Sequence, residues 1–378
     1  MSSSILKKNL LKEIDSTVES YLGAFLDPIG DRIRGTFRSL SYKVSSSLED
    51  DIDIDELFAG VETPRVDEKE CIIRVTGLSK VFGPQPQKGL KLVKNGMSKQ
   101  DLRESTGLTL GLYDNSFDVY KGELFVLMGL SGSGKSTLER CLNRLIDPTE
   151  GSIKIEGLEI TDLERDELIE VRRKKMGMVF QNFALLPHRT VMENVGFGLE
   201  IQGEPLDIYT ERCQNAIDMV GLKGYEDAYP SGLSGGMKQR VGLARALASD
   251  PDILLMDEAF SALDPLIRKD MQDELIQIRK KMGKTIIFVT HDLDEALKLG
   301  DRIALMNDGV IVQIGTPAEI VNNPVDDYVN RFVQNVNQER VDELMRKDAK
   351  RKADAEKRKK LKEMVKKKQK AAPPMGGA

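Results

Sequence analysis

Cysteine, long apolar runs and a large excess of one charge are scarce or missing in this sequence of 378 residues, and each scarcity excludes a class of protein. The three cysteines, Cys71, Cys141 and Cys213, have no spacing typical of a disulfide framework or a zinc site, so we expect reduced thiols. No apolar run approaches the roughly 18 to 20 residues that span a bilayer, and the N-terminus is too charged for a secretory signal. The formal net charge of −5 is mild and indicates no electrostatic binding of nucleic acid. We therefore expect a cytoplasmic protein that reaches a membrane only through partners.

The residue patterns divide the chain into three regions. Residues 1–70 place apolar residues on one helical face before an acidic stretch, and we expect a partly helical N-terminal extension. Docking at a membrane interface or on a partner is one hypothesis for it, and an extension without such a role is the alternative. Residues 71–336 alternate short apolar strands with helical patterns, which predicts an α/β fold with a mainly parallel sheet. Residues 337–378 form a charged tail, helical or disordered, in which 337–370 holds 15 basic and 7 acidic residues. A solvated tail and a tail that binds anionic lipid are both compatible with this charge.

Six segments of the α/β region are typical of buried strands. They are CIIRVTGL (71–78), LFVLMG (124–129), MGMVF (176–180), DILLMD (252–257), TIIFVT (285–290) and DRIALM (301–306). The residues ALMNDGVIVQIG (304–315) predict a hairpin with Asp308 and Gly309 at its turn. Residues from about 182 to 231 lack such strands and predict an inserted helical subdomain.

A phosphate-binding loop is indicated by a glycine pattern that lies between a strand and a helix. Gly129 and Gly134 bracket four residues and are followed by Lys135 and Ser136, and the surrounding strand and helix are the context such a loop requires. Backbone N–H groups and the helix N-terminus would bind the phosphates, Lys135 would reach the β- and γ-phosphates, and Ser136 would offer its hydroxyl to Mg²⁺. The residues expected to bind the nucleotide here are Gly129, Ser131, Gly132, Gly134, Lys135, Ser136 and Thr137.

Two carboxylates follow the apolar run of residues 253–256. Because open α/β sheets place their ligands at the carboxyl ends of strands, Asp257 is predicted to support Mg²⁺ and Glu258 to polarise the attacking water. His291 follows another strand at the same sheet edge, where an imidazole can hydrogen-bond a γ-phosphate. The second histidine, His188, has no such context.

A second anion-binding turn, LSGGMKQR, begins another helix, and it offers the Ser234 hydroxyl and the backbone of Gly235 and Gly236. One chain has only one such turn and one phosphate loop. The simplest arrangement is a two-fold dimer in which the turn of each protomer closes over the ATP of the other.

The ordered motifs GLSGSGKST, FQNFALLPH, LSGGMKQR, LLMDEAFSALDP and VTHD resemble the nucleotide-binding subunit of ABC transporters, over about residues 71–336. The resemblance implies a P-loop NTPase core with an antiparallel β subdomain and an inserted helical subdomain. It also implies that Gln181 touches Mg²⁺ and links the site to the helical subdomain. Residues 261–264, including Asp264, would cross the dimer interface, and Phe82 would stack on adenine.

Within this family the chain is similar to the ATPase of glycine betaine/proline (quaternary amine) importers, including an insertion at residues 83–111. The similarity implies ATP and Mg²⁺ as cofactors and a place on the cytoplasmic face of the cell membrane. The implied partners are a second copy of the chain, integral-membrane permease subunits, and a substrate-binding protein reached through the permease. Many members carry a C-terminal pair of CBS modules, whereas here the charged tail follows Val336, so gating by such modules is not expected.

Three other functions stay open from the sequence. The first is a soluble ABC ATPase that acts on ribosomes or DNA, although such proteins usually carry two cassettes or long coiled coils. The second is an importer ATPase for another amine, such as choline or trimethylamine N-oxide. The third is a nucleotide-binding module without turnover, which the presence of both Glu258 and His291 disfavours.

Overall fold

The computed structural model describes residues 70–334, 336, 341–346, 349 and 353. Residues Lys69–Arg279 and Gly283–Ala378 belong to one compact unit, whose described part is considered below. The predicted N-terminal extension and most of the predicted basic tail lie outside the described residues. No helix in the described part of the chain is both long and apolar enough to cross a membrane.

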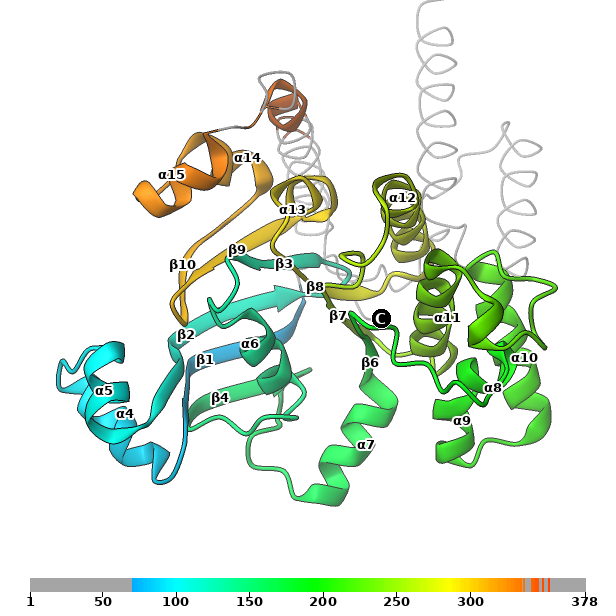
Figure 1. Ribbon diagram of the computed structural model, residues 1–378, viewed down its shortest axis with the longest axis horizontal. Coiled ribbons are helices and arrows are strands. Elements are labelled where there is room, and N and C mark those ends of the chain that lie inside the picture. The colour runs from blue at the N-terminus through cyan, green and yellow to red at the C-terminus, as the bar shows by residue number, and fades with distance from the viewer. Residues whose placement is uncertain (1–69, 335, 337–340, 347–348, 350–352, 354–378) are drawn as a thin grey trace, which may run out of the picture. The chain divides into compact units, whose positions relative to one another are not determined.

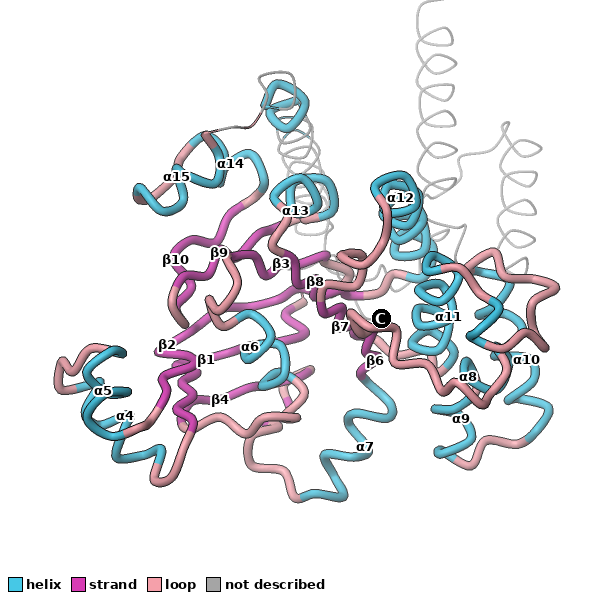
Figure 2. Tube along the Cα trace, in the orientation of Figure 1, coloured by secondary structure: helices cyan, strands magenta, loops and turns pink. Residues whose placement is uncertain are grey.

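A six-stranded sheet with the order β10-β9-β3-β8-β7-β6 forms the centre of the fold (Figures 1 and 2). Its strands are β3 (Leu124–Gly129), β6 (Met176–Val179), β7 (Ile253–Asp257), β8 (Thr285–Thr290), β9 (Arg302–Asn307) and β10 (Val310–Gly315). Every residue of β3, β7 and β8 is buried. These strands are mostly apolar because the two faces of a parallel sheet are both covered. Strand β10 runs antiparallel to β9 around Asp308 and Gly309, so the predicted hairpin is confirmed.

A four-stranded antiparallel sheet with the order β2-β1-β4-β5 packs beside the parallel sheet. Its strands are β1 (Cys71–Phe82), β2 (Thr109–Tyr120), β4 (Glu150–Ile155) and β5 (Leu158–Glu159). The rings of Phe117 on β2 and Phe125 on β3 stack with centroids 5.3 Å apart, within a buried apolar cluster that both sheets share. Leu138 and Leu142 of α6 (Lys135–Leu142) complete this cluster, which fixes the helix that follows β3.

The inserted helices lie between β6 and β7 in sequence. They are α8 (Val191–Val195), α9 (Phe197–Gln202), α10 (Leu206–Met219), the 3-10 turn Pro230–Gly232 and α11 (Gly235–Ala248). Helices α8, α10 and α11 pack against one another and form a group apart from the antiparallel sheet in Figure 1. The remaining helices are α7 (Arg165–Lys175), α12 (Pro265–Met282), α13 (Leu293–Leu299), α14 (Pro317–Asn322) and α15 (Asp327–Val333). The predicted fold class, an α/β core with an antiparallel β subdomain and an inserted helical subdomain, is confirmed.

The insertion between β1 and β2 folds into two helices, α4 (Pro86–Lys94) and α5 (Lys99–Thr106). They pack on Val81 of β1 and Leu110 of β2 in a small apolar cluster separate from the main core, in which Leu90 and Leu102 are fully buried. Phe82, the last residue of β1, pairs with Thr109, the first of β2. The insertion therefore leaves and rejoins the sheet at paired residues.

Candidate nucleotide site

The glycine loop lies where β3 ends and α6 begins. A Cβ atom at Gly129 would lie 2.3 Å from Met306 O and 2.6 Å from Ser133 Oγ, so only glycine fits. Gly134 caps α6 with a φ of 105°, and a Cβ there would lie 2.9 Å from Gly111 O. The close approach of three backbone segments therefore explains these two glycines of the motif.

Lys135 is buried beneath this loop, with 4% of its surface exposed. Its Nζ donates to Gly129 O at 2.9 Å and to Leu130 O at 3.0 Å. Burial lowers the pKa of the Lys135 ammonium, and the negative charges of Glu258 and Asp257 act in the opposite direction. The ammonium thus faces both the loop and the two carboxylates at the end of β7.

Ser136 and Asp257 meet below the loop. The Ser136 hydroxyl donates to Asp257 Oδ1 at 3.2 Å, and Arg140 Nη2 lies 3.7 Å from Oδ2 of the same carboxylate. Burial raises the pKa of Asp257, while the Ser136 hydrogen bond and the Arg140 charge lower it. The Ser136 hydroxyl and the Asp257 carboxylate therefore place oxygen atoms side by side, which is the type of ligand that hard cations prefer.

Glu258 is the centre of a second polar cluster. It takes a left-handed φ of 44°, and its N–H donates to Val289 O at 3.1 Å. Its Oε2 accepts a hydrogen bond from Gln181 Nε2 at 3.4 Å and lies 3.2 Å from His291 Nδ1. Gln181 Nε2 also donates to Ser261 Oγ at 3.3 Å. Residues that follow three adjacent parallel strands, β6, β7 and β8, therefore meet at one carboxylate.

The second glycine turn lies at the start of α11. Ser234 Oγ caps the helix by accepting the Met237 N–H at 3.3 Å. A Cβ at Gly236 would lie 2.7 Å from Ile267 Cγ2, so the turn packs against the first residues of α12. Asp264 caps α12 by accepting the Ile267 N–H at 3.2 Å. The Ser234–Gly236 turn and Asp264 are therefore neighbours within one chain.

Phe82 lies at the end of β1 and is 37% exposed. A Cβ at Gly111 would lie 2.6 Å from the Phe82 ring, so this ring rests on the glycine backbone. Lys80 Nζ lies 5.2 Å from the ring centroid and donates to Asp147 O at 2.7 Å. The exposed part of the Phe82 ring is a platform for a planar group.

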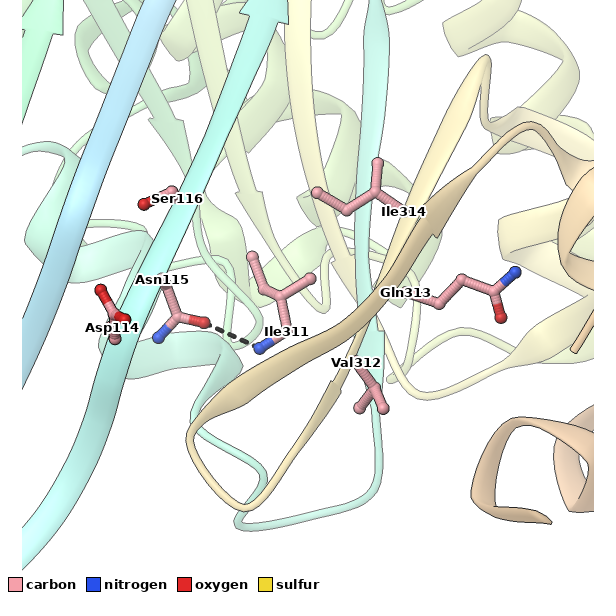
Figure 3. A pocket seen from close by; sticks show the side chains of 7 residues that line it. All are labelled: Asp114, Asn115, Ser116, Ile311, Val312, Gln313 and Ile314. Atoms are coloured by element: carbon pink, nitrogen blue, oxygen red, sulfur yellow. Dashed lines mark hydrogen bonds between the residues drawn. The ribbon is translucent and has the colours of Figure 1, made fainter. Parts of the chain in front are cut away.

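A shallow pocket of about 240 Å³ lies between β2 and β10, and none of the predicted site residues line it. Figure 3 shows Asn115 on β2 beside Ile311 on β10, whose N–H donates to Asn115 Oδ1 at 2.8 Å. Asn115 Nδ2 donates to Gly309 O at 2.8 Å, and the Gly309 N–H donates to Ser133 O at 2.8 Å. This buried amide therefore joins the two sheets and supports the phosphate loop from behind.

Two residues near the site were not predicted from the sequence. Glu139 on α6 is fully buried, and neither carboxylate oxygen has a hydrogen-bond partner among the described residues. Burial raises the pKa of Glu139 well above its ordinary value. Arg245 on α11 donates to the backbone just after Gln181. The apolar residues near Glu139 in TLERCL (137–142) could have indicated that this carboxyl is buried.

The strand, glycine loop and helix, with two carboxylates at the end of β7 in the same parallel sheet, define a P-loop nucleotide-binding cassette. Residues 112–261 match the model of the ABC transporter family. The glycine betaine transport ATP-binding protein OpuAA of Bacillus subtilis is 59% identical over 276 residues, which cover 73% of this chain and 66% of that protein. The trimethylamine N-oxide transport system ATP-binding protein TmoW of Ruegeria pomeroyi is 52% identical over 71% of this chain and 79% of its own length. The chain belongs to the ABC transporter family of ATP-binding proteins.

A solved structure agrees with this family. The dimeric, post-hydrolysis ATP-binding cassette MJ0796 bound to ADP and Pi is similar with a TM-score of 0.55 and 31% identity, over 65% of this chain and 98% of that one. The match to OpuAA spans just under two thirds of the length of that relative.

Proposed function

We propose that this chain is the ATP-hydrolysing subunit of an ABC importer for glycine betaine, proline or a related quaternary amine. The observation that carries the proposal is the convergence of Gln181 and His291 on the Glu258 carboxylate, beside the loop that holds Lys135. A module that only binds nucleotide needs no carboxylate placed in this way. Relatives named for glycine betaine and proline betaine transport support the transporter class.

The oxygen pair of Ser136 and Asp257 fits Mg²⁺, which prefers hard oxygen ligands and keeps several waters and phosphate oxygens in its shell. Gln181 would add a side-chain oxygen. When bound, Mg²⁺ neutralises charge that develops on the β- and γ-phosphate oxygens. In the same proposal Phe82 stacks on adenine, and the backbone of residues 129–137 binds the phosphates.

Glu258 would orient and polarise the attacking water, since its carboxylate is held on one side by Gln181 and His291. Lys135 would hold the β- and γ-phosphates. His291 is 57% exposed at the side chain and is free to hydrogen-bond the γ-phosphate while it stays close to Glu258. The catalytic residues of the proposal are therefore Glu258, His291 and Gln181.

Two copies of the chain would form the working unit. Ser234, Gly235 and Gly236 begin a helix of 14 residues, whose N-terminus is suited to a phosphate. In a two-fold dimer this turn would close over the partner's ATP, with Asp264 beside it at the interface. Residues 71–336 would form this ATPase domain, flanked by the 1–70 extension and the 337–378 tail.

The dimer would act at the cytoplasmic face of the cell membrane, bound to permease subunits that receive solute from a separate binding protein. Glycine betaine is the first candidate solute, because two relatives named for its transport are 59% and 55% identical to this chain, against 52% for the trimethylamine N-oxide relative. Trimethylamine N-oxide is the second, because its ATPase subunit matches this chain over a larger share of its own length.

The enzymatic part is tested with Glu258→Gln. We expect its ATP hydrolysis rate to fall by roughly 10²-fold or more, because the base that polarises water is lost while nucleotide binding is kept. With ATP and Mg²⁺ the variant should accumulate as a dimer in light scattering, and with ADP it should be monomeric. Hydrolysis at the wild-type rate would contradict the mechanism.

The transport part is tested by reconstitution with permease and binding protein, across a salt series, with labelled glycine betaine and trimethylamine N-oxide. Uptake of glycine betaine that requires ATP and rises with salt would support an osmoprotectant importer. ATP-dependent uptake of trimethylamine N-oxide alone would keep the ATPase and reassign the solute. Uptake of neither would contradict the proposed solute class.

A further inference from the structure

The backbone just after Gln181 makes an unusual turn. Phe183 has a φ of 59° and Ala184 a φ of 49°, so two consecutive residues with side chains are left-handed. The Ala184 N–H donates to Asn182 O, which closes a three-residue turn around Phe183. A turn of this kind with positive φ is rare and strained, and it persists only where surrounding contacts hold it.

Arg245 provides such contacts from α11. Its Nη1 donates to Ala184 O at 2.6 Å and its Nη2 donates to Phe183 O at 3.0 Å. The guanidinium carbon lies 6.0 Å from the centroid of the Phe180 ring. Gly242, one helical turn earlier, also faces this backbone, because a Cβ there would lie 3.7 Å from Phe183 O. Arg245 therefore holds the turn by a two-pronged contact with consecutive carbonyls.

The guanidinium of Arg245 is suited to binding two consecutive carbonyls. Burial lowers the pKa of Arg245, because the guanidinium loses water where it packs against the backbone carbonyls. A planar fork can donate to two carbonyls at once, whereas the ammonium of lysine is a compact charge without that geometry. Arg245 thus differs from an ordinary surface cation on α11.

We propose that Arg245 is a positioning residue, which holds the strained 182–184 turn so that Gln181 faces Glu258 and Ser261. The inference rests on the proposed function for the roles of Gln181 and Glu258. It adds a physical link between the two ends of α11. The helix begins at the Ser234–Gly236 turn, and Arg245 near its end donates hydrogen bonds to the backbone that follows Gln181.

The test uses Arg245→Lys in the full-length protein, with amide hydrogen exchange and ATP hydrolysis as readouts. Without nucleotide, exchange at residues 182–185 should become about tenfold faster, since two hydrogen bonds that hold the turn are weakened. The hydrolysis kcat should fall by about tenfold, while KM should stay within about twofold, because Gln181 is misplaced but the phosphate loop is intact.

A second variant, Ala184→Gly, makes the test specific to the strained turn. Glycine adopts positive φ without steric cost, so the turn depends less on Arg245. We expect the double variant Arg245→Lys with Ala184→Gly to regain about half or more of the lost kcat on a logarithmic scale. A merely structural role of Arg245 in α11 would show no such rescue.

Arg172→Lys is the matched control. Arg172 also donates to two consecutive carbonyls, Asn143 O at 2.8 Å and Arg144 O at 2.7 Å, and Arg144 is left-handed as well. This control should leave exchange at 182–185 and kcat unchanged. Unchanged exchange at 182–185 in Arg245→Lys, or absence of rescue by Ala184→Gly, would overturn the proposal. The exchange readout needs no ATP hydrolysis, so it separates this inference from a failure of the proposed function.

Discussion

Glu139 shows at the scale of one residue how a buried carboxyl affects stability. Its folded-state pKa is raised by burial and by the charge of Asp257, and both its oxygens lack a hydrogen-bond partner among the described residues. Glu139 therefore releases its proton at a higher pH in the folded protein than in the unfolded chain, which titrates near the ordinary pKa. Stability is lost as pH rises from that ordinary value towards the raised one.

We predict that Glu139→Leu stabilises the protein at neutral pH by about 1–3 kcal/mol, the usual cost of an unsatisfied buried polar group. The gain should be larger at pH 8 than at pH 5, measured by urea denaturation. Glu295→Leu is the control, because Glu295 is buried but accepts hydrogen bonds from Thr290 Oγ1 at 2.6 Å and Gln272 Nε2 at 3.1 Å. That control should destabilise. A destabilised Glu139→Leu protein would contradict the prediction.

The meeting of Gln181, Glu258 and His291 was predictable to a useful degree, because each follows a strand of one parallel sheet and the carboxyl ends of such strands share an edge. The roles assigned to them stay predictions. The contact of Arg245 with Phe183 and Ala184 was not predictable. It joins residues about sixty positions apart and depends on the angle at which α11 meets the core.

At the scale of elements, all six strands of the parallel sheet and strand β1 were predicted from the sequence, whereas β2, β4 and β5 of the antiparallel sheet were not. Strands β3, β7 and β8 are continuous apolar runs bounded by polar residues. Strands β2 and β4 alternate between buried and exposed residues, and several bulges interrupt the pairing of β1 with β2. A bulge adds one residue to a strand and so shifts its alternation of apolar and polar residues. The period-two pattern that predicts a strand is therefore interrupted in this part of the sequence.

The insertion helices α4 and α5 should unfold locally without loss of the main fold. We predict that Leu102→Ala lowers the free energy of unfolding of the insertion helices by about 2–5 kcal/mol, the usual range for a fully buried leucine, because Leu102 lies in the small apolar cluster that holds these helices on β1 and β2. Hydrogen exchange should rise in residues 86–106 and stay unchanged in β3 and β7. Leu206→Ala is the control, because Leu206 is 77% exposed. It should change the free energy of unfolding by less than about 0.5 kcal/mol. If hydrogen exchange in the Leu102→Ala protein rose equally in residues 86–106, β3 and β7, the prediction of local unfolding would be contradicted.

At the scale of the whole molecule, the charge of residues 337–370 predicts a salt-sensitive contact with anionic lipid. Its 15 basic residues would each contribute up to about 1 kcal/mol near such a surface, reduced by the 7 acidic ones. We expect the full chain to bind vesicles that contain anionic lipid at low salt and to be released at high salt, as measured by sedimentation. A chain that ends at Val336 should bind weakly at both. Equal binding of the two proteins would remove this role for the tail.

The pairing of Phe82 with Thr109 has a consequence for engineering and for evolution. Whatever is spliced between these two residues starts and finishes at one point on the sheet edge, so its length need not disturb the strands on either side. The two ends of the insertion therefore form one attachment point for a grafted domain, next to the Phe82 ring. If Phe82 stacks on adenine as proposed, a fluorescent domain grafted there would report nucleotide binding by its emission.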